Sequence, residues 1–149
     1  MSDIKTRLQN DMKAAMKAKE KARLTTIRSA LAAIKQKEVD GQTTLDDDQI
    51  IAVVDKMVKQ RKESLSQYQE AGRDDLADVE TAEIAVLQEY LPAALSDAEI
   101  SSMIDAAIAE SGAESMRDMG KVMGLLKPKM QGRADMSAVS ATIKAKLNG

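Results

Sequence analysis

The residues whose types and spacing could do chemistry lie between positions 118 and 135. Of the residues in that segment, four cations and two glycines are the candidates: Lys121, Lys127, Lys129, Arg133, Gly120 and Gly132. Basic side chains and the main-chain amides before a helix are groups that bind phosphate. The glycine spacing matches neither a P-loop nor a dinucleotide fingerprint, which argues against a mononucleotide site. The segment therefore predicts contacts to the backbone of a folded RNA, with a solvated loop as the alternative.

Other basic residues allow a secondary site. Arg28 and Lys35 fall within about 40° of Leu24 on a helical projection, inside the expected apolar stripe. We favour an interpretation in which they pair with acids of neighbouring helices over one in which they meet a phosphate or partner. A basic cluster near position 60 is typical of a solvated helix face. The candidates for a secondary basic site are Arg28, Lys35, Lys59, Arg61 and Arg73.

The missing residue types exclude most catalytic chemistry. The chain has no Cys and no His, so it lacks a thiol nucleophile, a thiolate zinc site and the commonest general base. Its two tyrosines are too few for an aromatic platform that stacks bases. Neighbouring acids such as Asp74 and Asp75 are explained by helix capping. We expect no catalytic residue, metal or cofactor.

The charge is segregated along the chain. Residues 1–40 carry ten Lys or Arg against five Asp or Glu, whereas residues 41–95 carry five against twelve. From position 117 onward there are seven bases and two acids. A net charge of −2 therefore conceals a cationic end that could meet RNA. No apolar run could span a membrane and no apolar signal is evident, so the expected location is cytoplasmic.

Composition and periodicity predict an all-α protein, because Ala, Leu and Met favour helices and aromatic residues make up only 1%. We expect about four helices in residues 1–91. The second should end with a left-handed cap at Gly41, and a capping box of Thr44 and Asp47 should start the third. The fourth should end before Pro92.

A second domain of three helices is expected at residues 96–149. Ser96 with Glu99 forms a capping box, and Ser115 with Asp118 would form another. Pro128 should stop the middle helix. Asp135 should then cap the last one. Six of the ten methionines lie in this domain, where we expect them to fill a core without aromatic rings.

Several motifs in order resemble the YqeY family. They are Ile27-Arg28, Lys59-Gln60-Arg61-Lys62-Glu63-Ser64, Ala71-Gly72-Arg73, Tyr90-Leu91-Pro92, Asp118-Met119-Gly120-Lys121-Val122-Met123 and Gly132-Arg133-Ala134-Asp135. The resemblance covers nearly the whole chain. Met136 stands where the family commonly has glycine.

The resemblance implies a module that handles tRNA. YqeY proteins are similar to the C-terminal helical and tail domains of GatB, the B subunit of aspartyl/glutamyl-tRNA amidotransferase. That enzyme is a carbon–nitrogen ligase with glutamine as amido-N-donor, and its catalysis belongs to a separate domain. We therefore expect binding of tRNA or another structured RNA without a catalytic centre. The alternative is a protein-interaction module that docks an aminoacyl-tRNA enzyme or self-associates.

Overall fold

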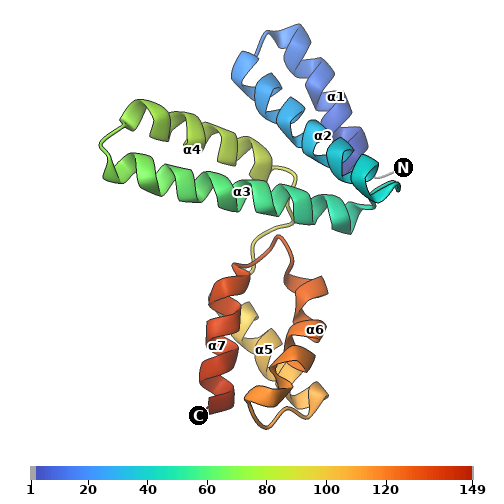
Figure 1. Cartoon of the computed structure of the whole chain (residues 1–149), viewed down its shortest axis with the longest axis vertical. Helices are drawn as coiled ribbons and strands as arrows, with labels where there is room; N and C mark the ends of the chain where they lie inside the picture. The colour runs from blue at the N-terminus through green and yellow to red at the C-terminus, as the bar shows by residue number, and fades with distance from the viewer. Residues whose placement is uncertain (1–2, 149) are drawn as a thin grey trace. The chain divides into compact units, whose positions relative to one another are not determined.

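The structure, a computed structural model, describes residues 3–148, and these residues form α-helices and one 3-10 turn without strands. The expected all-α class is confirmed (Figure 1). The chain divides into two compact units, one ending at Leu91 and the next beginning at Pro92. Because the second unit starts four residues before the expected boundary at Ser96, it includes the segment that leads into its first helix.

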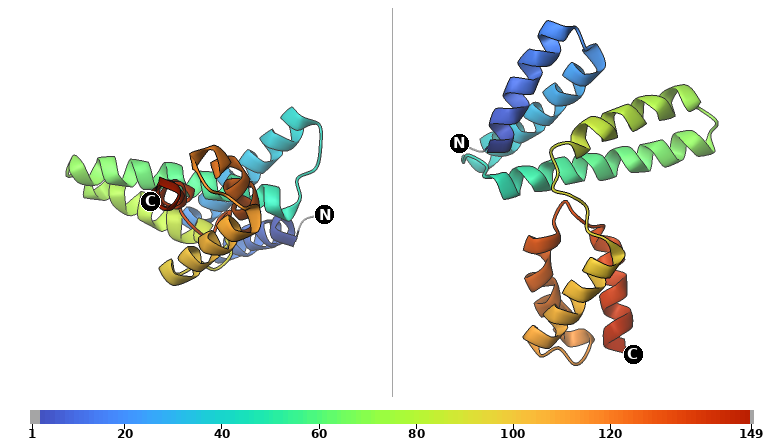
Figure 2. Two further views of the ribbon diagram at one scale, coloured as in Figure 1. Left: turned by 90° about the horizontal axis from the view of Figure 1, so that it is seen from below. Right: turned by 180° about the vertical axis from the view of Figure 1, so that it is seen from behind.

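The first unit consists of two helical hairpins. Its helices are α1 (Asp3–Ala18), α2 (Lys21–Gly41), α3 (Asp47–Glu70) and α4 (Asp74–Gln88). The right-hand view of Figure 2 shows α1 beside α2 and α3 beside α4. Apolar side chains from all four helices form one core, and its largest fully buried members are Leu8, Ile27, Ile34, Ile50, Val54 and Leu87.

Two helix ends in this unit differ from the expectation by a residue or two. Gly41 is still helical, and Gln42 adopts the left-handed cap, with φ of 50°. The capping box at the start of α3 consists of Asp46 and Gln49, whose side chains and main-chain N–H groups bond reciprocally at 2.9 Å. The expected box was wrong because Leu45, 5% exposed, enters the core. Its burial makes the next residue the cap.

The second unit is a smaller bundle. Its elements are α5 (Asp97–Ser111), the 3-10 turn η1 (Met116–Asp118), α6 (Met119–Met130) and α7 (Met136–Asn148). Its core joins α5, α6 and α7 through the buried side chains of Ile104, Ala107, Val122, Leu126, Met130, Val139 and Ile143. The core-filling role of methionine is confirmed for Met130, which is fully buried, whereas Met116 is 37% exposed.

The capping box of Ser96 and Glu99 is confirmed, with both reciprocal hydrogen bonds present. The box expected at Ser115 is wrong, because the Asp118 carboxylate instead accepts from the main-chain N–H of Glu114 at 3.1 Å. That hydrogen bond and nearby Lys121 hold the pKa of Asp118 below its usual range.

Pro128 does not stop α6, which continues to Met130. Proline near the end of a helix removes only one bond of the ladder, the one to the carbonyl four residues earlier. The ladder is present again at the end of the helix, since the N–H of Gln131 donates to the carbonyl of Lys127 at 3.0 Å. Full burial of Met130 holds this last turn in place. Lys127 and Lys129 therefore lie on a helix and not in a loop.

Candidate functional site

Helix α6 presents a backbone surface with little side-chain cover. Its inner face is buried, while Gly120, Lys121, Gly124 and Lys127 are exposed. At about 100° per residue these four lie on one side of the helix, and we call them the glycine face. A Cβ built on Gly120 or Gly124 would meet no atom of the described chain within 4 Å. Internal packing therefore does not require either glycine, although each weakens a helix by about 1 kcal/mol relative to alanine.

The three lysines of α6 have little internal pairing. The Nζ of Lys121 lies 3.8 Å from Asp118, and its side chain is 70% exposed. Lys127 and Lys129 are exposed and form no ion pair within residues 3–148. Both occupy the last turn of α6, where cations complement the negative end of the helix dipole. Their ammonium groups are available to an anionic molecule.

Arg133 is engaged inside the second unit. Its Nε donates to the carbonyl of Ala93 at 3.0 Å, and its own carbonyl accepts from the N–H of Leu95 at 2.9 Å. These bonds tie the segment before α5 to the turn between α6 and α7. The sequence placed Arg133 with the phosphate-binding lysines, whereas the structure gives it a role in holding the unit together.

Gly132 adopts a left-handed conformation, with φ of 76°, in the turn beside Arg133. We expect Gly132→Ala to lower the free energy of unfolding by about 1–2 kcal/mol, because a Cβ is strained there. Gly120→Ala is the matched control and should raise that free energy by up to about 1 kcal/mol, since Gly120 is helical and unobstructed. Urea denaturation followed by circular dichroism measures both. Equal effects of the two substitutions would contradict this assignment.

The expected placement of Arg28 and Lys35 in the apolar stripe of α2 is wrong. Both side chains are exposed and make no ion pair within the described residues. The stripe runs through Ile27, Ala30 and Ile34, which are all fully buried. The projection failed because it was centred on Leu24, which is only half-buried.

The remaining secondary candidates each pair with an acid. Lys59 Nζ lies 3.4 Å from Asp55, one turn earlier on α3. The ion pair from Arg61 reaches Glu83 on α4 at 2.9 Å, and that from Arg73 reaches Asp75 at 3.2 Å. All three ion pairs lie within the first unit. The five secondary candidates are distributed over α2, α3 and the turn before α4, and three of them are held in ion pairs within the unit.

A buried tyrosine cluster was missed by sequence reasoning. The Tyr90 hydroxyl donates to Asp11, and the guanidinium of Arg7 lies 5.1 Å from the centre of the ring. Arg23 forms a two-pronged ion pair with Glu89 next to it. Burial of Tyr90 raises the pKa of its phenol well above the usual range, and the hydrogen bond to Asp11 adds to the shift. The cluster joins α1 and α2 to the residues that directly follow α4.

Residues 3–148 contain no group of three or more acids that could hold a metal ion. None of the helices in this range is long and apolar enough to cross a bilayer.

Residues 5–147 match the family described as Yqey-like protein. The chain belongs to the YqeY family. The resemblance that its motifs carry is confirmed, because the match covers both units of this YqeY chain.

Similar curated proteins come from fungi and are named "Altered inheritance of mitochondria protein 41, mitochondrial". The protein from Pyrenophora tritici-repentis is 33% identical over 142 residues, which cover 93% of this chain and 77% of the relative. The protein from Vanderwaltozyma polyspora is 41% identical over 85 residues, covering 56% and 46%. This chain covers about half the length of the relatives from Vanderwaltozyma polyspora, Eremothecium gossypii and Clavispora lusitaniae, at 46%, 51% and 55%.

The comparison contradicts the expected cytoplasmic location, because these relatives are named as mitochondrial proteins. The expectation depended on the lack of an apolar signal segment. That criterion detects secretion only, since mitochondrial targeting segments are amphipathic and basic.

Proposed function

We propose that the second unit of this YqeY chain binds tRNA or another structured RNA through the glycine face and Lys129. The single observation that carries the proposal is the coincidence of two uncovered glycines with two exposed lysines, of which Lys127 forms no ion pair within residues 3–148 and Lys121 only a solvent-exposed one at 3.8 Å. Bare backbone lets a sugar–phosphate chain approach closely, and the lysines neutralise its phosphates. Recognition would depend on the shape of the RNA and little on its base sequence.

The resemblance to the tail domain of GatB supports the same proposal. In that context the chain would bring RNA to glutamine-dependent amidation carried out by other proteins, or dock an aminoacyl-tRNA enzyme. We expect no amide transfer from glutamine by the chain alone, because the sequence has no nucleotide cradle and places no candidate glutaminase nucleophile in a recognisable setting.

Binding to purified total tRNA, measured at increasing salt concentration, tests whether the lysines of α6 neutralise RNA phosphates. Three lysines that neutralise phosphates predict a slope of about −2 to −3 in a plot of log affinity against log salt. Lys127→Glu should weaken binding about tenfold or more at low salt and make the slope shallower. Lys144→Glu is the matched control, because Lys144 is also exposed in the same unit but lies on α7. Equal losses in the two variants would refute the proposed site.

A steric substitution tests the glycine face without changing charge. Gly124→Leu should weaken tRNA binding by about tenfold, although it should stabilise α6. Ala109→Leu is the control, since Ala109 is exposed on α5 of the same unit. Unchanged binding by Gly124→Leu would show that RNA does not approach this backbone.

A further inference from the structure

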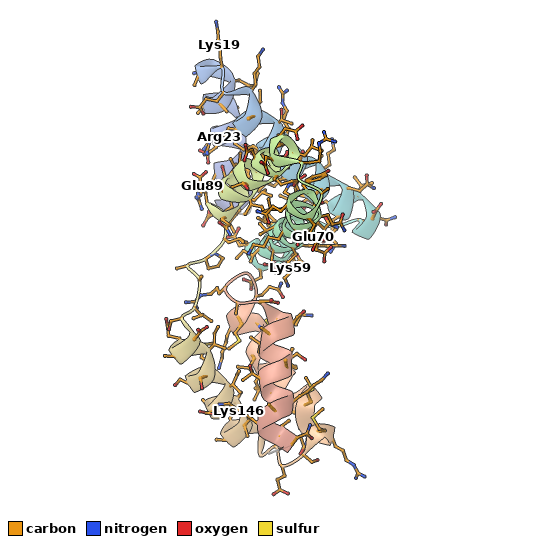
Figure 3. The ribbon with its side chains drawn as sticks, turned by 90° about the vertical axis from the view of Figure 1, so that its left-hand side faces the viewer. Lys19, Arg23, Lys59, Glu70, Glu89 and Lys146 are labelled. Atoms are coloured by element: carbon orange, nitrogen blue, oxygen red, sulfur yellow. The ribbon has the colours of Figure 1, made fainter. Side chains whose placement is uncertain are left out.

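A groove lies between the first half of α2 and the middle of α4 in the first unit. Its volume is about 510 Å³. Small or apolar side chains from both helices line it: Ala22, Thr25, Thr26, Val79, Ala82 and Val86. Arg23, which also lines the groove, bonds to Glu89 just beyond the end of α4 and so bridges the two helices there (Figure 3).

Much of the groove's charge is already neutralised within the chain. Arg23 pairs with Glu89, and Glu83 on the α4 wall pairs with Arg61. Lys21 on the α2 wall and Asp78 on the α4 wall line the groove, are exposed, and form no ion pair within residues 3–148. The groove therefore offers one unpaired cation on one wall and one unpaired anion on the other.

Helix α4 also carries an outward apolar ridge. Val79, Ala82 and Val86 recur at the spacing of a helix–helix seam on the groove side of α4; Val79 and Ala82 are exposed there, whereas Val86 is half-buried and also packs against the core. Val79 is 53% exposed, which leaves a β-branched apolar side chain in water. Ala82 between the two valines leaves room for a second helix to approach.

We propose that this groove is the interface of a symmetric dimer of the chain. The α4 ridge of each copy occupies the groove of the other, and Lys21 of each copy faces Asp78 of the other. A twofold interface uses the same patch on both subunits and must be complementary to itself. The groove meets that condition in two ways. Its α2 wall carries the unpaired cation Lys21 and its α4 wall the unpaired anion Asp78, so each wall can face the opposite charge of the other copy. The apolar ridge of α4 also borders the apolar groove that it would fill in the other copy. This interface is independent of RNA binding by the second unit.

Sedimentation velocity of the full chain, from micromolar to millimolar concentration, tests the apolar contact. We expect a monomer–dimer equilibrium whose dissociation constant rises at least tenfold in Val79→Asp. Val39→Asp is the matched control and should associate like the wild type, because Val39 is 62% exposed on α2 but does not line the groove. Lys127→Glu should also dimerise normally, which separates this test from that of RNA binding.

Charge exchange tests the pairing. Lys21→Glu and Asp78→Lys should each weaken self-association, since each places like charges opposite one another. Their equimolar mixture should recover association, because the mixed dimer restores both opposite-charge pairs. Circular dichroism verifies that the variants remain folded.

The proposal is overturned if the wild type stays monomeric at millimolar concentration, which would assign the groove to another occupant. It is equally overturned if Val79→Asp associates like the wild type or if the mixture does not recover association.

Discussion

Leu126→Ala should unfold the second unit while the first remains folded. Leu126 is 1% exposed at the centre of the core between α5, α6 and α7. Truncation of a buried leucine to alanine removes about 2–5 kcal/mol through lost transfer free energy and a cavity. A domain of this size rarely has more than about 3–5 kcal/mol of stability in total. The single substitution therefore removes most of what holds the unit together.

Amide NMR signals recorded during urea titration measure this effect for each unit separately. In Leu126→Ala, signals from residues 97–148 should disperse poorly without denaturant, whereas those from residues 3–88 should keep their wild-type midpoint. Leu125→Ala is the control. The Leu125 side chain is only half-buried, so its truncation should lower the free energy of unfolding of the second unit by less than Leu126→Ala does. Joint unfolding of all residues in Leu126→Ala would contradict the independence of the two units.

Alkaline pH should destabilise the first unit through Tyr90. Because burial raises the pKa of Tyr90 above its unfolded value near 10, the neutral phenol stabilises the fold fully below about pH 10. Above that pH the unfolded chain loses the proton and the folded chain keeps it. The stability then declines by up to about 1.4 kcal/mol per pH unit until the folded phenol also ionises.

Comparison with Tyr90→Phe isolates this contribution, since the lysines titrate in both proteins. The free energy of unfolding should fall more steeply in the wild type than in Tyr90→Phe between pH 10 and 12. Below pH 10 the difference between the two proteins should be constant. Parallel curves across the whole alkaline range would show that the Tyr90 phenol ionises equally in both states.

The helical elements could be predicted because their periodicity and caps are local. The box of Ser96 and Glu99 needs only residues three apart, and it forms as expected. Two predicted helix ends, the start of α3 and the end of α6, were wrong because burial of a side chain determines them. Leu45 enters the core and moves the start of α3, and Met130 anchors a turn that Pro128 alone would end. Such effects depend on contacts between distant residues, which spacing does not report.

The candidate site was predictable in part for the same reason. Gly120, Lys121 and Lys127 lie close in sequence and share one face of α6. Arg133 looked equivalent to the lysines, yet its partner Ala93 is forty residues away. The Tyr90 hydroxyl and Asp11 are separated by 79 positions. No local pattern reveals those two contacts.

The bonds of Arg133 decide where a separately expressed tail fragment should begin. A fragment cut at Ser96 loses both the Ala93 carbonyl and the Leu95 amide, so it leaves the Arg133 side chain and main-chain carbonyl without their partners. A fragment cut at Pro92 keeps both bonds and still omits every residue of the first unit. Residues 92–95 look like a linker in the sequence, but they are a structural part of the second unit, because their main-chain groups bond to Arg133.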